Sequence, residues 1–200
     1  MEKHPTAIRN FVAGKINMLQ NQSESSSRAT LAKLRRGVGK HPGSIPDIWD
    51  ITLGNLPDVF FSNYGEPTSG EWAVHMSLTL FALHQQGKDP KQKPMSKSDE
   101  SSKSLGDAVR TLLSAKGEAA KDAIKRRFDT VITSNSPEEL AYHLRGVIQL
   151  LRSESISLDY PRLAEDLYRF QSPALRDGVR LIWGQGYYAS NRKDEENNEK

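Results

Sequence analysis

Residues 68–86 read TSGEWAVHMSLTLFALHQQ, and this stretch determines the fold that the sequence predicts. At its start, the side chain of Thr68 can accept a hydrogen bond from the amide of Glu71, and the Glu71 carboxylate can reach back to the amide of Thr68. This capping box predicts that a helix begins here. The residues that follow, 72–86, are apolar almost all round a helix, so we expect them at the buried centre of the N-terminal half.

The other periodic segments also predict helices, because their apolar residues recur every three or four positions. No pair of alternating runs surrounds a two-residue turn, so no β-hairpin is expected. In the first half, besides residues 72–86, we predict a helix over residues 6–22, a short helix that begins at a cap provided by Ser26 or Ser27, and at best short helical pieces within 45–61. In the second half, a capping box at 104–107 precedes a helix over 108–113, and further helices are predicted over 117–133, 136–154 and 158–170. A last helix begins at 172–173. We therefore expect an all-α protein of two packed helical lobes, without a sheet.

Polar segments divide these helices into regions. Residues 87–103 are rich in Lys, Ser, Asp and Pro, and Met95 is their single large apolar residue. This composition predicts a flexible polar linker, whose lysines could touch phosphates loosely or could belong to a plain solvated loop. The expected organisation is an N-terminal helical lobe (1–86), the linker (87–103), a C-terminal helical bundle (104–191) and a disordered charged tail (192–200).

The composition excludes several kinds of chemistry. The chain of 200 residues has no cysteine, so disulfides, thiolate catalysis and cysteine-bound zinc are excluded. It has no nucleophile elbow, phosphate-binding glycine loop or paired metal-binding histidines, so we expect neither an enzyme nor a cofactor. The first 22 residues have no apolar core suited to export, and no stretch is long enough to span a membrane. We therefore expect a soluble, cytoplasmic protein.

Positive charge is concentrated in one segment. Residues 28–40 carry five basic residues and no acidic one, whereas the net charge of the whole chain is only +3. The same segment keeps an apolar seam at Leu31, Leu34 and Val38, with the spacing of one helix face. A helix that buries one face and exposes an unneutralised cationic face is typical of a surface that binds a nucleic-acid backbone.

A helical wheel separates the basic residues of this segment into two sets. Lys33, Arg36 and Lys40 point away from the core and are free to contact phosphates. Arg28 and Arg35 lie nearer the apolar seam, so they could be partly structural or could serve a neighbouring subunit.

Further basic residues lie on the helices of the second half. Arg145 and Arg152 are seven residues apart and share one side of their helix, whereas Arg176 and Arg180 are i, i+4 neighbours that could grip adjacent phosphates. Each could instead form an ordinary ion pair within the fold. The complete set of candidate nucleic-acid contacts is Arg28, Lys33, Arg35, Arg36, Lys40, Lys121, Lys125, Arg126, Arg127, Arg145, Arg152, Arg176 and Arg180.

Two alternative functions stay open from the residues alone. Asp47, Asp50 and Asp58 are close in sequence, and a metal-dependent nuclease needs carboxylates that converge. They fall in an irregular Pro- and Gly-rich stretch without a second carboxylate cluster, so a helical nuclease accessory is less favoured. The other alternative is a purely structural helical adaptor without nucleic-acid contacts. Trp183, on an apolar stripe, is expected in the core rather than stacked on bases.

Several motifs follow one another along the chain, and they are Arg28-Ala29-x-Leu31-Ala32-x-Leu34-Arg35-Arg36-Gly37, Ser104-Leu105-Gly106-x-Ala108, Arg126-Arg127-Phe128, His143-Leu144-Arg145, Leu158-Asp159-Tyr160-x-Arg162-Leu163-x-x-Asp166-Leu167 and Trp183-Gly184. In this order they resemble the small subunit of type I-E CRISPR Cascade, the CasB family. The resemblance spans residues 6–189, and the ordered set carries it rather than any single motif.

The resemblance implies an all-α, non-catalytic protein, present as two head-to-tail copies in an RNA-guided surveillance complex of antiviral defence. Its implied partners are other Cascade subunits, the guide RNA, and the target and displaced DNA strands, with no membrane. The contacts carried over are Arg28, Arg35, Arg36, Arg126, Arg127 and Arg145. The chain departs from the family pattern at residues 184–188 (GQGYY), where relatives often carry a charged residue and fewer glycines, and this weakens the expectation of a contact by the last helix.

Overall fold

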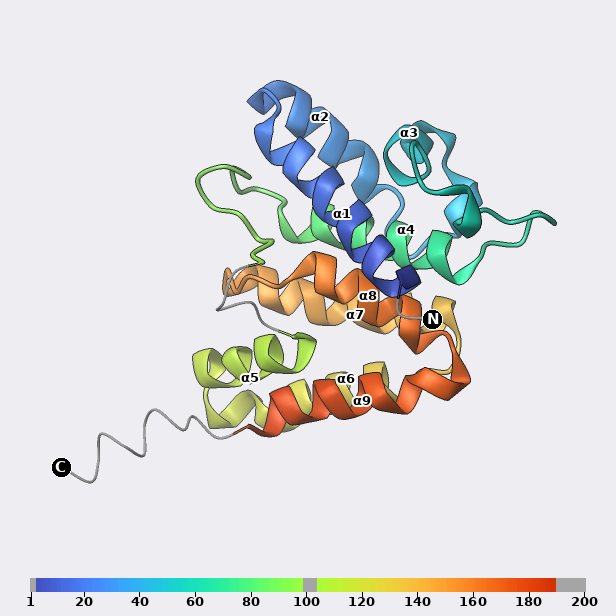
Figure 1. Cartoon of the computed structure of the whole chain (residues 1–200). Helices are drawn as coiled ribbons and strands as arrows, with labels where there is room; N and C mark the ends of the chain where they lie inside the picture. Colours follow the sequence, from blue (N-terminus) through green and yellow to red (C-terminus); the bar gives the residue numbers. More distant parts are fainter. Residues whose placement is uncertain (1–2, 99–103, 190–200) are drawn as a thin grey trace.

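A computed structural model describes residues 3–98 and 104–189, and their regular secondary structure is helical (Figure 1). The α-helices are α1 (Lys3–Asn21), α2 (Glu24–Arg35), α3 (Trp49–Thr52), α4 (Ser69–His84), α5 (Leu105–Lys116), α6 (Lys121–Thr133), α7 (Pro137–Ser153), α8 (Tyr160–Phe170) and α9 (Pro173–Tyr188). Short 3₁₀ helices fill the connections at η1 (Pro42–Ser44), η2 (Pro46–Ile48), η3 (Asp58–Phe60) and η4 (Glu118–Ala120). The described residues contain no strand beyond one isolated bridge between Ser96 and Leu158. The prediction of an all-α fold is confirmed.

Helix α4 lies at the centre of the molecule, and the capping box predicted at its start is present. Thr68 Oγ1 accepts a hydrogen bond from the Glu71 amide at 3.2 Å, and Glu71 Oε2 accepts one from the Thr68 amide at 2.8 Å. The buried hydroxyls of Ser77 and Thr79 donate to carbonyls one turn earlier, which satisfies them inside an apolar helix. Helices of both halves pack on α4, namely α1 and α2 together with α7 and α8. The apolar stretch is therefore the centre of the whole molecule, not of the N-terminal half alone.

Helix α8 joins the two halves, because it packs against α1 and α4 on one side and against α9 on the other. The buried Tyr160 hydroxyl at its start donates to the Leu80 carbonyl at 3.2 Å and lies 3.0 Å from Nδ1 of His84. One core of buried apolar side chains thus runs through both halves. The division into two lobes stays a prediction, and the expected tail (192–200) lies outside the described residues, as do residues 99–103 of the expected linker.

Residues 87–98, the described part of the expected linker, are anchored to the core. The side-chain amide of Gln85 donates to the carbonyls of Lys88 and Lys93, at 3.1 and 3.0 Å, and its oxygen accepts from the Met95 amide at 2.9 Å. The side chain of Met95 is itself buried. These contacts differ from the solvated linker that the composition predicts. The composition of a segment does not show that one buried side-chain amide, that of Gln85, will bind three of its backbone groups.

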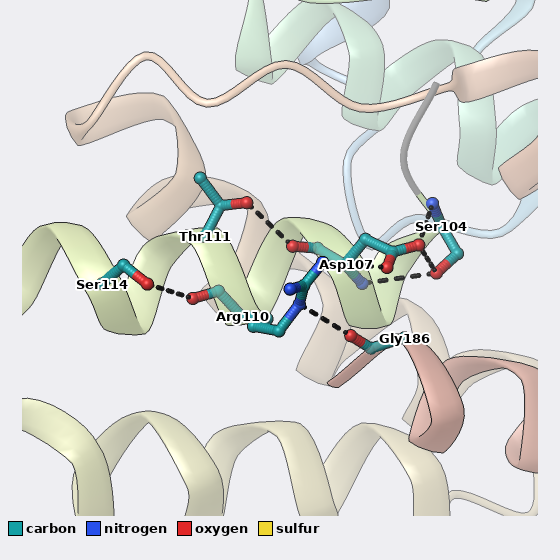
Figure 2. Close-up of polar contacts among 6 residues, drawn as sticks. All are labelled: Ser104, Asp107, Arg110, Thr111, Ser114 and Gly186. Carbon is teal, nitrogen blue, oxygen red and sulfur yellow. Dashed lines mark hydrogen bonds and ion pairs between the residues drawn. The ribbon is translucent and has the colours of Figure 1, made fainter. Parts of the chain in front are cut away.

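Helices α5 and α9 approach each other closely at two glycines. A Cβ atom on Gly106 would lie 1.8 Å from the carbonyl oxygen of Trp183, and one on Gly186 would lie 2.6 Å from Ser104 Oγ. Figure 2 shows the crossing, where Arg110 Nε donates to the Gly186 carbonyl at 3.1 Å beside the capping box of α5. Of the two glycines in the stretch 184–188, Gly186 therefore serves this close packing, whereas a Cβ atom on Gly184 would meet nothing within 4 Å.

The aromatic side chains of α9 confirm the prediction that Trp183 belongs to the core. Its ring is fully buried and stacks on Phe170 with centroids 5.5 Å apart, while its Nε1 donates to Asp166 Oδ2 at 2.7 Å. Tyr187 is also buried and stacks on Phe128. These rings hold α9 against α6 and α8.

Candidate nucleic-acid interface

The basic segment of the sequence forms α2 and the turn that follows it. Ser23 caps the helix and accepts a hydrogen bond from the amide of Ser26 at 3.4 Å, so the helix begins earlier than predicted. Serines occupy several neighbouring positions, and the hydroxyl of each could cap the helix. The sequence alone therefore does not single out Ser23 as the cap. Leu31 and Leu34 are buried, as the apolar seam predicted.

The side chains of Lys33, Arg36 and Lys40 are exposed, as the helical wheel predicts. The prediction of one helix through residue 40 is wrong, however, because α2 ends at Arg35 and Lys40 lies in the turn that follows, where the glycines 37 and 39 interrupt the helix. The Arg36 guanidinium lies 2.9 Å from the carboxylate of Asp47, which neutralises part of its charge. Arg28 is exposed as well and pairs with a glutamate one turn earlier. Surface pairs of this kind hold a side chain weakly, so a phosphate can compete for it.

Basic residues from three distant parts of the chain converge on one groove. A cleft of about 290 Å³ lies between α2 and the turn after α4, and Arg28, Arg35 and Lys88 contribute to its wall. Arg152, near the end of α7, is not part of this wall but lies beside it. Its guanidinium donates to Oε1 of the wall residue Gln86 at 2.8 Å, and its carbonyl accepts a hydrogen bond from Lys88 Nζ at 3.0 Å. We name the cleft together with Arg152 the α2–α7 groove, and its basic residues are Arg28, Arg35, Lys88 and Arg152.

Like charges accumulate in the α2–α7 groove. Burial lowers the pKa of the Arg35 guanidinium, and the positive field of Arg152 lowers it further. The pKa of Lys88 is also lowered, first by burial and then by Arg152 and Lys93. Asp89 lies in the groove wall, but its carboxylate already accepts two backbone amides of its own turn. Mutual repulsion of this kind is relieved when an anion enters the groove.

A second groove, of about 500 Å³, runs between α6 and α7. Arg127 and Arg145 line it from the two helices, both are exposed, and neither forms an ion pair with any residue of 3–98 or 104–189. Tyr142 is 71% exposed, and Gly146 lies one turn further along α7. We name this the α6–α7 groove, and its lining is completed by Thr130, His143, Gln149, Leu150 and Ser153.

Three other predicted contacts lie on α6 outside these grooves. Lys121 pairs with Glu118 at 2.7 Å and Lys125 pairs with Asp129 at 2.6 Å, and these hydrogen bonds raise the pKa of each lysine. Arg126 is exposed. Because the two lysines already have carboxylate partners in water, they offer less free charge to a phosphate than Arg127 and Arg145 do, which pair with no described carboxylate.

Arg176 and Arg180 share one side of α9, as their spacing predicts, but both guanidinium groups bind within the fold. Arg176 Nε donates to the Phe170 carbonyl at 2.9 Å. Arg180 donates to the carbonyls of Ile132 and Ser134, at 2.7 and 3.2 Å. Both also lie over the ring of Phe170, so these arginines tie α9 to the ends of α6 and α8.

We expect the substitution Arg180→Ala to lower the free energy of unfolding by about 2 kcal/mol, because it leaves two carbonyls without their charged donor. Urea unfolding followed by circular dichroism measures this loss. Arg126→Ala is the matched control, since that side chain is exposed, and it should change stability by less than about 0.5 kcal/mol. Equal stability of the two variants would contradict the structural role given to Arg180.

The three aspartates considered for a metal site do not form one. Asp47 pairs with Arg36, and the carboxylate of Asp50 accepts the amide of the next residue at 2.9 Å. No group of three His, Asp or Glu side chains that could hold a metal ion occurs in the part of the chain that the structure describes. Within the same part, no helix has the length and apolar character needed to cross a membrane.

Sequence reasoning missed three components of the grooves. The sequence predicts Lys88 only as a linker lysine that could touch phosphates loosely, because its contact with Arg152 of α7 depends on tertiary packing. Tyr142 carries a usable signal, because it is a large aromatic residue that lies off the apolar stripe of α7. Gly146 carries another, because a glycine in a helix interior weakens the helix and needs a reason.

Solved structures share this all-helical fold. The crystal structure of CasB from Thermobifida fusca is 31% identical, with a TM-score of 0.72 over 92% of this chain and 98% of that chain. A chain of a CRISPR RNA-guided surveillance complex is 20% identical, with a TM-score of 0.70 over 96% and 99% of the two chains. The crystal structure of M. ruber CasB is 22% identical, with a TM-score of 0.64 over 92% and 96%. The fold is thus that of the CasB proteins.

The chain belongs to the CRISPR-associated protein Cse2 family, whose family model matches residues 30–188. The matched region begins within α2 and ends at the last residue of α9, so it includes the α6–α7 groove and, except for Arg28, the residues that define the α2–α7 groove. No curated protein sequence matches the chain. The resemblance to the CasB family that the ordered motifs indicate is confirmed.

Proposed function

We propose that this protein is a non-catalytic subunit of an RNA-guided CRISPR surveillance complex and that it binds nucleic-acid backbones without reading their sequence. Its family membership and its likeness in fold to a chain of such a complex support this assignment. The observation that carries the binding role is the convergence of Arg35, Lys88 and Arg152 at the α2–α7 groove, where burial and then the positive charge of Arg152 lower the pKa of both Arg35 and Lys88. A polyanion would remove that penalty.

Helix α7 links the two grooves into one basic surface. Arg145 lies in the α6–α7 groove and Arg152 at the α2–α7 groove, on one side of the helix and roughly 10 Å apart along its axis. A single nucleic-acid strand can therefore contact both. In the proposed complex this surface stabilises the guide RNA–target DNA heteroduplex and the displaced DNA strand, while base pairing with the guide supplies the sequence recognition. Other Cascade subunits and a second copy of the chain are the proposed protein partners.

The dependence of binding on salt tests this function. With about five phosphates neutralised, log K for single-stranded DNA should fall against log[salt] with a slope of about −3.5. The triple substitution Arg35→Gln, Lys88→Gln, Arg152→Gln removes the converging charges, so the slope should become shallower by about 2 and the affinity should fall for all sequences alike. Fluorescence anisotropy at several salt concentrations measures both quantities.

The matched control removes the same number of positive charges from ion-paired sites, as Arg36→Gln, Lys121→Gln, Lys125→Gln. We expect a smaller loss of affinity and a smaller change of slope, because these side chains are already paired with carboxylates. Equal effects of the two triple variants would show that net charge matters and the α2–α7 groove does not. Absence of binding by the wild-type chain would favour the structural adaptor, and DNA cleavage with Mg²⁺ or Mn²⁺ that is lost on substitution of Asp47 or Asp50 would favour the nuclease accessory.

A further inference from the structure

We propose that the α6–α7 groove holds an unpaired nucleotide, with the base stacked on the ring of Tyr142 and the adjoining phosphate between Arg127 and Arg145. The inference rests on the proposed function and adds to it the form of nucleic acid that this groove selects. A base inside a duplex has both faces covered by its neighbours, so this groove would favour a single strand over a duplex.

The exposure of Tyr142 is the first observation. Tyr142 is 71% exposed on a helix whose other large apolar side chains face the core, and its hydroxyl forms no hydrogen bond with any described residue. The ring of His143 meets its ring edge to face, with centroids 5.2 Å apart. An exposed aromatic ring offers a base a π-face on which to stack.

The glycine one turn after this ring is the second observation. Gly146 lies in the interior of α7, where glycine weakens the helix relative to alanine. A Cβ atom there would meet no atom within 4 Å, so packing does not require glycine at this position. Residues four apart on a helix are neighbours, so the missing side chain leaves space beside Tyr142 on the groove wall.

The charges and size of the groove supply the third observation. Arg127 from α6 and Arg145 from α7 bring two guanidinium groups to its wall, and no described carboxylate pairs with either. Guanidinium groups bind phosphate oxygens with two parallel hydrogen bonds, which suits a phosphodiester. The amide of Gln149 can bond a base edge, and the hydroxyl oxygens of Thr130 and Ser153, which donate their protons to the carbonyls of Arg127 and Leu150, can accept from one. A volume of about 500 Å³ is enough for one nucleotide. An acidic peptide would satisfy the arginines but would leave the exposed ring unused.

Three fluorescein-labelled probes separate the base from the backbone. They are a 12-nucleotide oligothymidine, an abasic strand with the same number of phosphates, and a blunt duplex of the same length. Tyr142→Ala should weaken binding of the full chain to oligothymidine about tenfold, without changing the salt slope, and should leave the abasic and duplex affinities unchanged. Tyr142→Phe keeps the ring and should bind oligothymidine as the wild-type protein does. An oligouridine probe shows whether RNA or DNA fits better, because the 2′-hydroxyl is then the main difference.

A steric variant tests the same groove without removing the ring or a charge. Gly146→Leu places a side chain in the open space, so the protein should unfold at the same or a higher temperature while its affinity for oligothymidine falls about tenfold. Gly178→Leu is the matched control, since a Cβ there also meets nothing within 4 Å but the residue lies on α9, away from the groove. It should bind oligothymidine with unchanged affinity.

The outcomes distinguish the inference from the function on which it rests. If the wild-type chain binds oligothymidine and the abasic strand equally, and Tyr142→Ala changes neither, the stacking site is wrong while the backbone-binding function stands. If Tyr142→Ala weakens both probes equally, the residue acts through the fold and the inference is again wrong. If the wild-type chain binds none of the probes, both the proposed function and the inference fail.

Discussion

Replacing Gly106 by alanine should lower the free energy of unfolding by about 3 kcal/mol, which is a large part of the stability of a typical domain. The new Cβ atom would lie 1.8 Å from the carbonyl oxygen of Trp183 and 2.7 Å from its carbonyl carbon. These are backbone atoms, so no side chain can rotate away, and α5 must move from α9. That movement would also disturb the hydrogen bond from Arg110 to the Gly186 carbonyl. Chemical denaturation of the wild-type protein and the variant measures the difference.

Gly184→Ala is the control for this prediction, because it changes the same residue type on the partner helix. A Cβ atom on Gly184 would meet nothing within 4 Å, so alanine should raise the free energy of unfolding by about 0.5–1 kcal/mol through its greater helix propensity. The two substitutions therefore have opposite expected signs. If Gly106→Ala left stability unchanged or raised it, the close approach of α5 and α9 at this residue would be wrong.

The helices could be predicted from the sequence because their signals are local. The capping box of Thr68 and Glu71 and the Pro137 start each depend on residues within one turn, and both appear where the sequence places them. Distant contacts have no such local signal. The approach of Gly106 to the carbonyl of Trp183 joins residues far apart in the chain, and nothing in the motif around Gly106 says which helix it meets.

Prediction of the candidate site from the sequence is limited in the same way, because local patterns do not show distant contacts. Helical geometry correctly placed Lys33 on the exposed face of α2, and Arg36, which directly follows the last residue of that helix, is exposed as well. It also placed Arg176 and Arg180 on one side of α9, but it could not show that carbonyls of neighbouring segments occupy their guanidinium groups. The cleft between α2 and the turn after α4, and the contacts of Arg152 from α7 with Gln86 and Lys88 beside it, follow from the packing of both halves on α4, which no local pattern encodes.

The second large effect that we expect concerns the pH dependence of stability. Burial raises the pKa of Asp166 from 3.8 to about 6, against the opposing effect of its hydrogen bond from Trp183. Burial, followed by the positive charge of Lys88, lowers the pKa of His84 from 6.5 to about 3. The pKa of His75 is also lowered, chiefly by burial. The core thus contains a carboxyl that resists ionisation and imidazoles that resist protonation.

These groups act in opposite directions between about pH 4 and pH 6. In that window the folded protein keeps a proton on Asp166 that the unfolded chain releases, so this residue makes stability fall as pH rises, by about 1.4 kcal/mol per pH unit. The unfolded chain takes up a proton on His84 that the folded protein excludes, so this residue makes stability fall by a similar amount as pH falls below about 6.5. In the wild-type protein the two contributions largely cancel, and His75 adds to the loss in acid.

Asp166→Asn should therefore uncover the effect of the histidines. Asparagine keeps an oxygen that can accept the hydrogen bond from Trp183 Nε1 but has no proton to release, so the variant should match the wild-type protein near pH 4 and exceed its stability by about 3 kcal/mol above pH 6.5. His84→Gln should do the reverse and make the protein less sensitive to acid than the wild type. Guanidinium unfolding followed by circular dichroism at half-unit steps from pH 4 to pH 7.5 measures all three curves. If the free energy of unfolding varied with pH in parallel for the wild-type protein and Asp166→Asn, Asp166 would ionise in the folded protein as readily as in the unfolded chain. The hydrogen-bonded pair of Asp166 and Trp183 would then be open to water, which would contradict its burial.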